Sequence, residues 1–203
     1  MIRGVYAVTP DIVDTELLCK LVSAAIAGGA SLVQYRNKLA NHALQVKQAR
    51  ALLPICRQHQ VPLIINDSIE LCLTLDADGV HLGADDGNLA LARARLGANK
   101  ILGASCYNRF ELAQSAQQAG ADYVAFGACF ASSTKPHAPI ASLDLFKQAK
   151  MLSIPSVAIG GITLKNAPLV IEAGANALAM INAIFSVDNV ESTTQQFSQL
   201  YIS

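Results

Sequence analysis

The sequence predicts an α/β protein folded as a closed (β/α)8 barrel with eight parallel strands. Eight short apolar runs, each ending at a polar residue or a glycine, recur along the chain, and helical periodicity fills the stretches between them. Strands that alternate with helices form a parallel sheet, and eight such units close into a TIM barrel. The charged fraction of only 15% agrees with strands that are buried on both faces.

The predicted strands follow one another at regular spacing. In order they are VYAVT (5–9), SLVQYR (31–36), PLIIND (62–67), GVHLG (79–83), ILGAS (101–105), YVAFG (123–127), SVAIGG (156–161) and ALAMIN (177–182). The carboxyl ends of all strands in such a barrel gather at one face, where active sites are built. We therefore expect the residues that end these runs to converge on one site.

The stretches between the first three predicted strands have the pattern of helices. Apolar residues recur at helical spacing across 14–29, with Asp14 as the expected N-cap and Gly28-Gly29 as the expected stop. The second helix is expected over 41–60, where we expect Pro54 to bend or break it.

Length, charge and cysteine content limit the class of protein. The 203 residues predict one domain, 1–203, and the net charge of zero gives no basis for binding nucleic acid or a membrane surface. No run reaches the length of a membrane span and no signal peptide is evident. The five cysteines are odd in number and unclustered, as in cytoplasmic proteins with free thiols. The sequence leaves a homodimer open.

Acidic residues follow two neighbouring strands. Asn66 and Asp67 close the third run, and Asp85-Asp86 follow the fourth. Mg²⁺ favours one or two protein carboxylates, with waters and substrate phosphate oxygens completing its shell. Alternatively, Asp67 caps the next helix and Asp85-Asp86 form a surface turn. Two carboxylate positions on adjacent strand ends favour the metal site.

Three polar side chains alternate at the end of the second run. Gln34, Arg36 and Lys38 are expected to point the same way on an extended segment. Arginine binds phosphate in a bidentate manner and lysine acts as a point charge. A solvated strand end with lysine and arginine stems lying along the surface is the alternative. The combination of amide, guanidinium and ammonium favours a ligand site.

Two further loops carry groups that suit oxyanions. Ser132 to Lys135 follow the sixth run, in a loop over 128–142 that is long enough to act as a lid. Gly160-Gly161 ends the seventh run and Ile181-Asn182 the eighth. Loops after strands seven and eight often bind phosphate in this fold. A tight turn alone would also explain the two glycines.

Two further polar residues, His81 and Ser105, lie within the fourth and fifth runs. His81 lies inside the fourth run, and we interpret it as a hydrogen-bonded packing residue. Ser105 ends the fifth run with no evident His–carboxylate pair to activate it as a nucleophile. We therefore expect Ser105 to act by hydrogen bonding.

Taken together, these motifs resemble the thiamine-phosphate synthase family over nearly the whole chain. The motifs are Q-Y-R-N-K, I-I-N-D, D-G-V-H-L-G-x-D-D, L-G-A-S, F-G-x-x-F-x-S-S-T-K, A-I-G-G-I and A-M-I-N-A-I, in this order. The resemblance implies a transferase that joins a hydroxymethylpyrimidine diphosphate to a thiazole phosphate and releases pyrophosphate, with Mg²⁺ as cofactor.

The resemblance also implies a role for each matching residue. Pyrimidine diphosphate would be bound by Gln34, Arg36, Lys38 and Asn66. Mg²⁺ would be bound by Asp67 and Asp86. The reacting pyrimidine and its leaving group would be lined by Ser105 and Lys135, the expected catalytic residues. Thiazole phosphate would be held by Ser132, Thr134, Gly160, Gly161, Ile181 and Asn182.

The chain departs from the family pattern at three places. Ser68 stands where the family usually has arginine, Ala84-Asp85 where it commonly has Gln-Glu, and Asn182 where it commonly has serine. The first change removes one positive charge near the expected pyrophosphate. Two alternatives therefore stay open: an isomerase resembling thiazole tautomerase, and a non-catalytic relative that binds a phosphate ligand.

Overall fold

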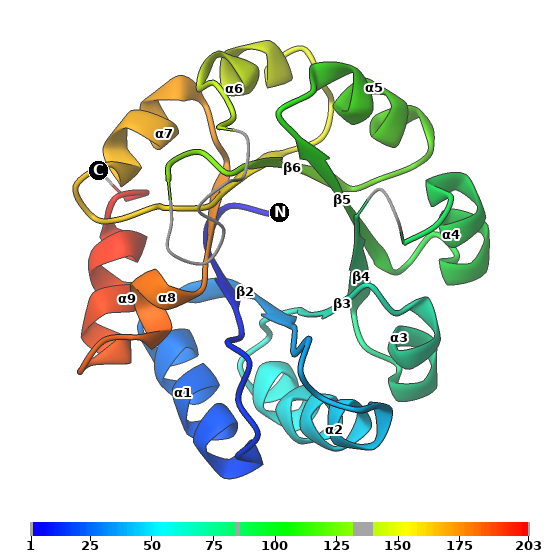
Figure 1. Ribbon diagram of the computed structural model, residues 1–203, viewed down its shortest axis with the longest axis vertical. Helices are drawn as coiled ribbons and strands as arrows, with labels where there is room; N and C mark the ends of the chain where they lie inside the picture. Colours follow the sequence, from blue (N-terminus) through cyan, green and yellow to red (C-terminus); the bar gives the residue numbers. More distant parts are fainter. Residues whose placement is uncertain (1, 84–85, 132–139, 203) are drawn as a thin grey trace.

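The protein forms a closed barrel of eight parallel strands surrounded by helices (Figure 1). The computed structural model describes residues 2–83, 86–131 and 140–202. Each strand pairs in parallel with the next one along the chain, and β8 pairs with β1 to close the barrel. The predicted (β/α)8 fold is confirmed.

The elements alternate as the sequence predicts. The strands are β1 (Gly4–Val8), β2 (Ala30–Tyr35), β3 (Leu63–Asn66), β4 (Gly79–Leu82), β5 (Ile101–Tyr107), β6 (Tyr123–Gly127), β7 (Ser156–Ile159) and β8 (Ala177–Met180). The helices among the described residues are α1 (Thr15–Ala27), α2 (His42–Gln58), α3 (Ile69–Leu75), α4 (Leu89–Leu96), α5 (Phe110–Gln118), α6 (Asp144–Ala149), α7 (Ala167–Ala173), α8 (Asn182–Phe185) and α9 (Val190–Gln199).

The first two helices can be compared with the helices predicted from the sequence. Asp14 caps α1 as predicted, since its carboxylate accepts the backbone N–H groups of Glu16 and Leu17, and Gly28 ends the helix. Of the two effects expected of Pro54, a break in the second helix is excluded, because α2 continues to Gln58, and a bend stays a prediction. Pro54 is exposed, whereas its neighbours Leu52, Leu53 and Cys56 are buried. Packing of that buried face against the barrel holds the last turn in place.

Side chains alternate between the two faces of the barrel wall. Outward residues of each strand pack beneath the helices in the main core. The interior is filled by a second cluster, Tyr6, Val8, Leu32, Ile64, Tyr123, Ala125, Val157, Ala177 and Ala179. The aromatic rings of Tyr6 and Tyr123 meet edge to face, with centroids 5.9 Å apart. Two tyrosines therefore occupy the middle of the barrel.

Tyr123 fits only because its neighbour on β5 lacks a side chain. A Cβ atom built on Gly103 would lie 2.1 Å from Cζ of Tyr123 and 2.3 Å from its hydroxyl oxygen. Neither atom can move aside, because Tyr123 is fully buried. Gly103 therefore fixes where the phenol lies.

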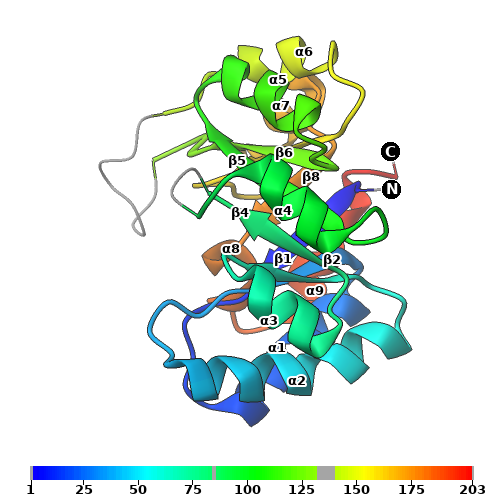
Figure 2. The ribbon, with the colours of Figure 1, turned by 90° about the vertical axis from the view of Figure 1, so that its right-hand side faces the viewer.

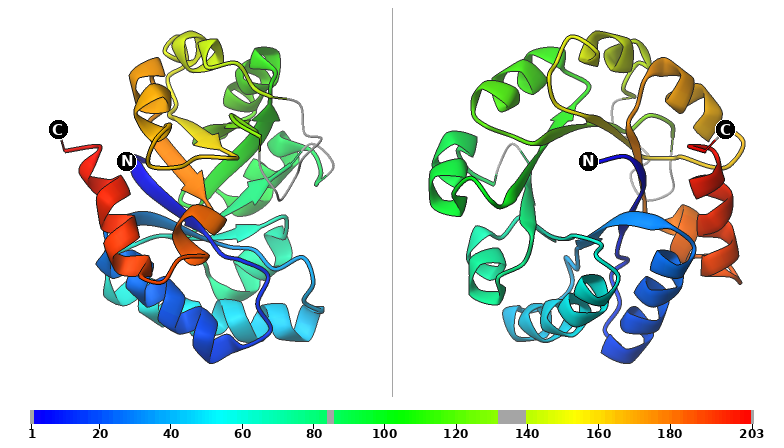
Figure 3. Two further views of the ribbon diagram at one scale, coloured as in Figure 1. Left: turned by 60° about the vertical axis from the view of Figure 1, so that its left-hand side comes forward. Right: turned by 180° about the vertical axis from the view of Figure 1, so that it is seen from behind.

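The face at which the strands begin is closed, and both chain ends lie there. Arg3 donates from Nη2 to the backbone oxygen of Tyr201 at 3.2 Å, and Figure 2 shows the two ends together, on the side away from the loop between β2 and α2. Ile2 packs against the interior cluster, and the start of the chain lies over the centre of the barrel (Figure 3). None of the helices in the described part of the chain has the length and apolar character needed to cross a bilayer.

Replacing Gly103 with alanine tests this packing. We expect Gly103→Ala to lower the free energy of unfolding by roughly 1–3 kcal/mol, because the added methyl overpacks the interior. The penalty should be smaller in a Tyr123→Leu background, where the clashing atoms are gone. Urea unfolding of the two single variants and the double variant measures this coupling. Simple additivity of the two changes would contradict the proposed contact.

Candidate active site

An open cavity of about 280 Å³ lies where β2 and β3 end. Its lining includes Arg36, Lys38, Asn66, Asp67 and Ser68. Four of these residues were predicted from sequence to bind the diphosphate or the metal, and the fifth is the position of a family departure. The structure thus brings together residues from two neighbouring strand ends.

Asp11, which the sequence analysis missed, organises both cations of this cavity. Its carboxylate oxygens lie 3.1 and 3.2 Å from Nη1 of Arg36, and one of them accepts the backbone N–H of Lys38 at 2.7 Å. Thr9, at the end of β1, exchanges two hydrogen bonds of 2.8 Å with the backbone of Arg36. The only sequence signal was an acidic residue shortly after the first strand.

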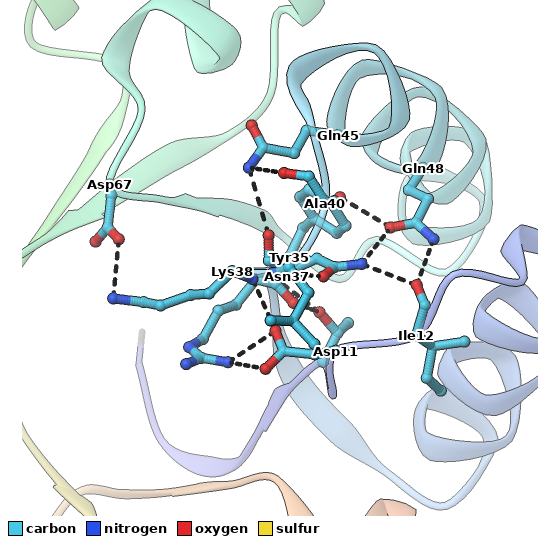
Figure 4. Close-up of polar contacts among 12 residues, drawn as sticks. Asp11, Ile12, Tyr35, Asn37, Lys38, Ala40, Gln45, Gln48 and Asp67 are labelled. Carbon is cyan, nitrogen blue, oxygen red and sulfur yellow. Dashed lines mark hydrogen bonds and ion pairs between the residues drawn. The ribbon is translucent and has the colours of Figure 1, made fainter.

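Asn37 has a structural role between these two cations. It is buried, and its side-chain amide donates to the backbone oxygen of Ile12 at 2.8 Å and to Oε1 of Gln48 at 3.0 Å (Figure 4). Gln48 is itself fully buried and donates to the same oxygen of Ile12. These bonds fix the turn after β2, while the side chain of Lys38 stays 57% exposed. Lys38 can therefore reach a ligand from a rigid backbone.

The two predicted metal ligands lie together. Burial raises the pKa of Asp67, the neighbouring carboxyl of Asp86 raises it further, and Lys38 opposes both effects. Nζ of Lys38 lies 3.5 Å from Oδ2 of Asp67 (Figure 4). A carboxyl whose pKa is raised by burial and by a second carboxyl is a place where a cation could replace a proton. Two carboxylates are the number of protein ligands that Mg²⁺ often takes, with water or substrate oxygens completing its shell, so the metal site stays a prediction.

The alternative interpretation of Asp67 is wrong. The N-cap of α3 is Ser68, whose hydroxyl accepts the N–H of Leu71 at 3.1 Å. Asp67 instead donates its backbone N–H to the oxygen of His81. Asp86 does close a turn, since it accepts the N–H of Gly83 at 2.7 Å. Its carboxylate serves that turn and still lies beside Asp67.

A chain of four hydrogen bonds crosses the barrel interior below the cavity. Nε2 of Gln34 donates to the hydroxyl of Tyr6 at 2.7 Å, and that hydroxyl lies 2.7 Å from the hydroxyl of Tyr123. Tyr123 in turn contacts Nδ1 of His81 at 2.9 Å, and Nε2 of His81 contacts Oγ of Ser105 at 2.8 Å. We call this the interior hydrogen-bond chain.

The interior hydrogen-bond chain confirms the expectation for His81 and shows a partner of Ser105 that was not expected. His81 is buried and hydrogen-bonded, as predicted. Ser105 does have a histidine partner, which the sequence analysis did not find. The signal was present in the pairing of β4 with β5, where His81 lies opposite Gly103 and Ser105 follows two residues later on the same face. The third member is a phenol rather than a carboxylate, so the arrangement is not a catalytic triad.

Burial sets the protonation of these groups. It lowers the pKa of His81 to about 4, although Asp86 opposes the shift, so the imidazole is neutral at pH 7. Burial also raises the pKa of Tyr6 and of Tyr123. Both phenols therefore keep their protons.

The loops after β7 and β8 lie at the face of the barrel where the strands end, which we call the mouth, and they follow other strands than those that line the cavity. Gly160 and Gly161 have φ angles of +98° and +64°. A Cβ on Gly160 would lie 2.6 Å from Cβ of Ala128, and one on Gly161 would lie 2.5 Å from the backbone oxygen of Phe130. Only glycine therefore allows the segment after β6 to approach. Ile181 and Asn182 begin α8 beside them, and phosphate binding here stays a prediction.

Part of the predicted site lies outside the described residues. Ser132, Thr134 and Lys135 belong to that part, together with most of the loop expected to act as a lid. Their predicted roles remain predictions.

Comparison with known proteins decides the family. Residues 5–184 match the family described as thiamine monophosphate synthase. The chain belongs to this family. It is therefore an enzyme, a transferase of thiamine biosynthesis, as the resemblance of its motifs implied.

Individual relatives agree along nearly the whole chain. The chain is 56% identical to the thiamine-phosphate synthase of Methylobacillus flagellatus, covering 98% of this chain and 96% of that protein. It is 50% identical to that of Chromobacterium violaceum, covering 96% and 94%. A solved thiamine phosphate pyrophosphorylase from Pyrococcus furiosus superposes with a TM-score of 0.87 at 30% identity, covering 98% of this chain and 95% of that one.

The buried histidine of the barrel interior, His81, makes the stability of the fold depend on pH. Between pH 6.5 and about 4 the unfolded chain binds a proton at His81 and the folded chain does not. Stability from this residue is therefore present above pH 6.5 and lost as the pH falls to 4, by an amount of the order of 3 kcal/mol. The raised pKa of Asp67 acts in the opposite direction.

Comparing variants isolates the contribution of His81. Urea unfolding at a series of pH values should show a flatter profile for His81→Asn than for the native chain, because asparagine cannot take up the proton. The exposed His59 provides the control, and His59→Asn should keep the native slope. Parallel profiles for all three proteins would show that His81 titrates normally in the fold.

Proposed function

We propose that the protein joins a hydroxymethylpyrimidine diphosphate to a thiazole phosphate, giving thiamine phosphate and pyrophosphate, with Mg²⁺ as cofactor. The observation that carries the proposal is the meeting of Arg36, Lys38 and Asp67 around one cavity, with the carboxyl of Asp86 beside that of Asp67. The names of the relatives supply the product, thiamine phosphate, and the resemblance of the motifs implies the two substrates. The setting we propose is the reducing cytoplasm, since four of the five cysteines lie buried as free thiols.

The proposed chemistry asks for charge neutralisation rather than a strong base. The bond from the pyrimidine methylene carbon to the diphosphate oxygen breaks, and pyrophosphate leaves with the electron pair. The ring amino group stabilises the resulting pyrimidine cation until the thiazole nitrogen bonds to the same carbon. Mg²⁺ held by Asp67 and Asp86 would neutralise charge on the pyrophosphate oxygens. Binding both substrates close together supplies most of the remaining acceleration.

Arg36 and Lys38 have different parts in this scheme. Arg36 is paired with Asp11 and only 18% of its side chain is exposed, so it presents a fixed guanidinium edge. Lys38 is held by backbone contacts and its ammonium bridges to Asp67. When the diphosphate binds, Lys38 can turn from the carboxylate to a phosphate oxygen without moving the chain. The thiazole phosphate is assigned to the loops after β7 and β8.

The two alternative functions fit the site less well. An isomerase needs a proton-shuttling base and has no use for paired carboxylates beside two cations. The one imidazole of the described interior, His81, is engaged at both nitrogens. A non-catalytic relative was suggested by Ser68 and Asn182. Ser68 has a structural role of its own as the cap of α3, so only Asn182 still favours that alternative.

A turnover assay with both substrates and Mg²⁺ tests the proposal. Asp67→Asn and Asp86→Asn should each lower pyrophosphate release by roughly 10- to 100-fold or more, because each removes a cation ligand. Both variants should still unfold cooperatively on heating, which shows that the loss of activity is not a loss of the fold. Asp188→Asn changes an exposed carboxylate between α8 and α9 and serves as the control for charge.

The outcomes separate the metal site from the reaction. If a variant turns over normally at limiting Mg²⁺, the aspartate that was replaced is not a Mg²⁺ ligand. Absence of turnover by the native chain with both substrates and Mg²⁺ would overturn the proposed function.

The serine at position 68 gives a second test. Ser68→Arg adds a cation at the cavity and should lower the KM for the pyrimidine diphosphate, since a charge-assisted contact is worth roughly 1.5–3 kcal/mol and less where solvent reaches it. The KM for the thiazole phosphate should not change, and chloride should erode the gain.

Because Ser68 caps α3, the arginine variant also loses about 1 kcal/mol of stability. Ser68→Ala loses the same cap without adding charge. Steady-state kinetics and urea unfolding of both variants separate the two effects. Equal changes in both KM values would show that position 68 does not face the diphosphate.

A further inference from the structure

The interior hydrogen-bond chain joins two predicted site residues that are remote in sequence. Gln34 lies at one end and Ser105 at the other, and the links between them come from β1, β6 and β4. Tyr6 is 1% exposed and Tyr123 is 0% exposed. Water therefore cannot supply or accept a proton along the way, and each group must use its neighbours.

The number of protons that each group carries decides which group donates in every link of the interior hydrogen-bond chain. The amide nitrogen of Gln34 can only donate, so the hydroxyl of Tyr6 accepts from it. Tyr6 has one proton of its own, and the neighbour left to receive it is the hydroxyl of Tyr123. Tyr123 has one proton in turn, and it goes to Nδ1 of His81.

The direction continues to the mouth of the barrel. A neutral imidazole has one proton, and with Nδ1 accepting, that proton lies on Nε2 and is donated to Oγ of Ser105. The hydroxyl of Ser105 can then donate its own proton to a group that is not part of the interior hydrogen-bond chain. The side chain of Ser105 is partly exposed, so a ligand can receive it.

The opposite direction would give Ser105 another chemistry. If Gln34 presented Oε1 to Tyr6, every proton would reverse, and Ser105 would donate to His81. The serine would then resemble an activated nucleophile. Because each buried phenol has one proton and two polar neighbours, the links change direction together rather than singly. The orientation of one amide therefore selects between a donor and a nucleophile.

We propose that Tyr6, Tyr123 and His81 are positioning residues that transmit the orientation of the Gln34 amide to Ser105 and keep its hydroxyl as a hydrogen-bond donor. With Nε2 committed to Tyr6, Gln34 has Oε1 left to accept a hydrogen bond. The amino group of an aminopyrimidine is a matching donor, so that substrate holds the amide in this orientation. The catalytic consequence rests on the proposed function: the Ser105 proton meets negative charge that develops as pyrophosphate leaves.

The tautomer of His81 in the ligand-free protein is the first test. Nitrogen-15 NMR distinguishes a protonated ring nitrogen from a bare one, and the His81 signals are assigned by their loss in His81→Asn. We expect Nε2 to be protonated and Nδ1 bare. A proton on Nδ1, with Nε2 bare, would overturn the proposal.

Removing one hydroxyl tests the coupling along the chain. Tyr6→Phe does not touch His81 but separates Gln34 from Tyr123, so the imidazole should become a mixture of both tautomers with averaged shifts. Tyr35→Phe is the matched control, because it deletes another buried phenol that donates to a glutamine, Gln48, outside the barrel interior. Native shifts at His81 are expected in the control. Native shifts in Tyr6→Phe would show that Gln34 does not set the direction.

Kinetics then test the consequence for catalysis. Tyr6→Phe and Tyr123→Phe should each lower kcat by roughly tenfold, the effect of losing one hydrogen bond to a charged group, and leave the KM for the thiazole phosphate unchanged. Unchanged kcat in both variants would remove the catalytic part of the proposal. Absence of turnover by the native protein would refute the proposed function instead. The NMR result would still decide the direction of the interior hydrogen-bond chain.

Discussion

The hydroxyl groups of two tyrosines must be satisfied inside a sealed barrel, and much of the structure follows from this constraint. An eight-stranded barrel has an interior just wide enough for its own side chains. Tyr6 and Tyr123 fill that space and bring two polar atoms with them, which would be costly to leave unpaired. A neutral histidine and a glutamine amide are the partners that the neighbouring strands supply. Gly103 leaves the room that the second ring needs. Core packing and the polar groups of the site are thus one arrangement rather than two.

In the cavity at the mouth of the barrel, the charged side chains are already paired with one another when no ligand is bound. Asp11 opposes Arg36, and Lys38 opposes Asp67. Such pairs keep cations in position without leaving them uncompensated, and the exposed ones contribute little to stability by themselves. The site is therefore organised electrostatically, and under the proposed function its two carboxylates would take up a metal ion and its lysine a phosphate oxygen. This division between a largely buried arginine and an exposed lysine agrees with the chemistry of the two side chains.

The sequence was sufficient for the fold and for the positions of the site residues at strand ends, because the periodicities of two and of 3.6 residues are local properties. It was insufficient where a contact depends on two strands. Ser105 and His81 face each other only through the register of β4 with β5, and Asp11 reaches Arg36 across β1 and β2. Ser68 was known as a departure from a pattern, but its role as a cap depends on where α3 begins. Pro54 was judged by local propensity, which tertiary packing of α2 overrides.

The contact between Arg3 and Tyr201 has an architectural consequence. It brings the first and last segments of the chain side by side, on the face of the barrel away from its open mouth. A short linker could join them, and the ring could then be reopened in an exposed turn between a helix and the following strand, since proteins with neighbouring ends often accept circular permutation. A reporter domain fused at either end would likewise project away from the mouth. The closed face is thus the natural place for engineering this protein, because nothing attached there obstructs the entry of small molecules.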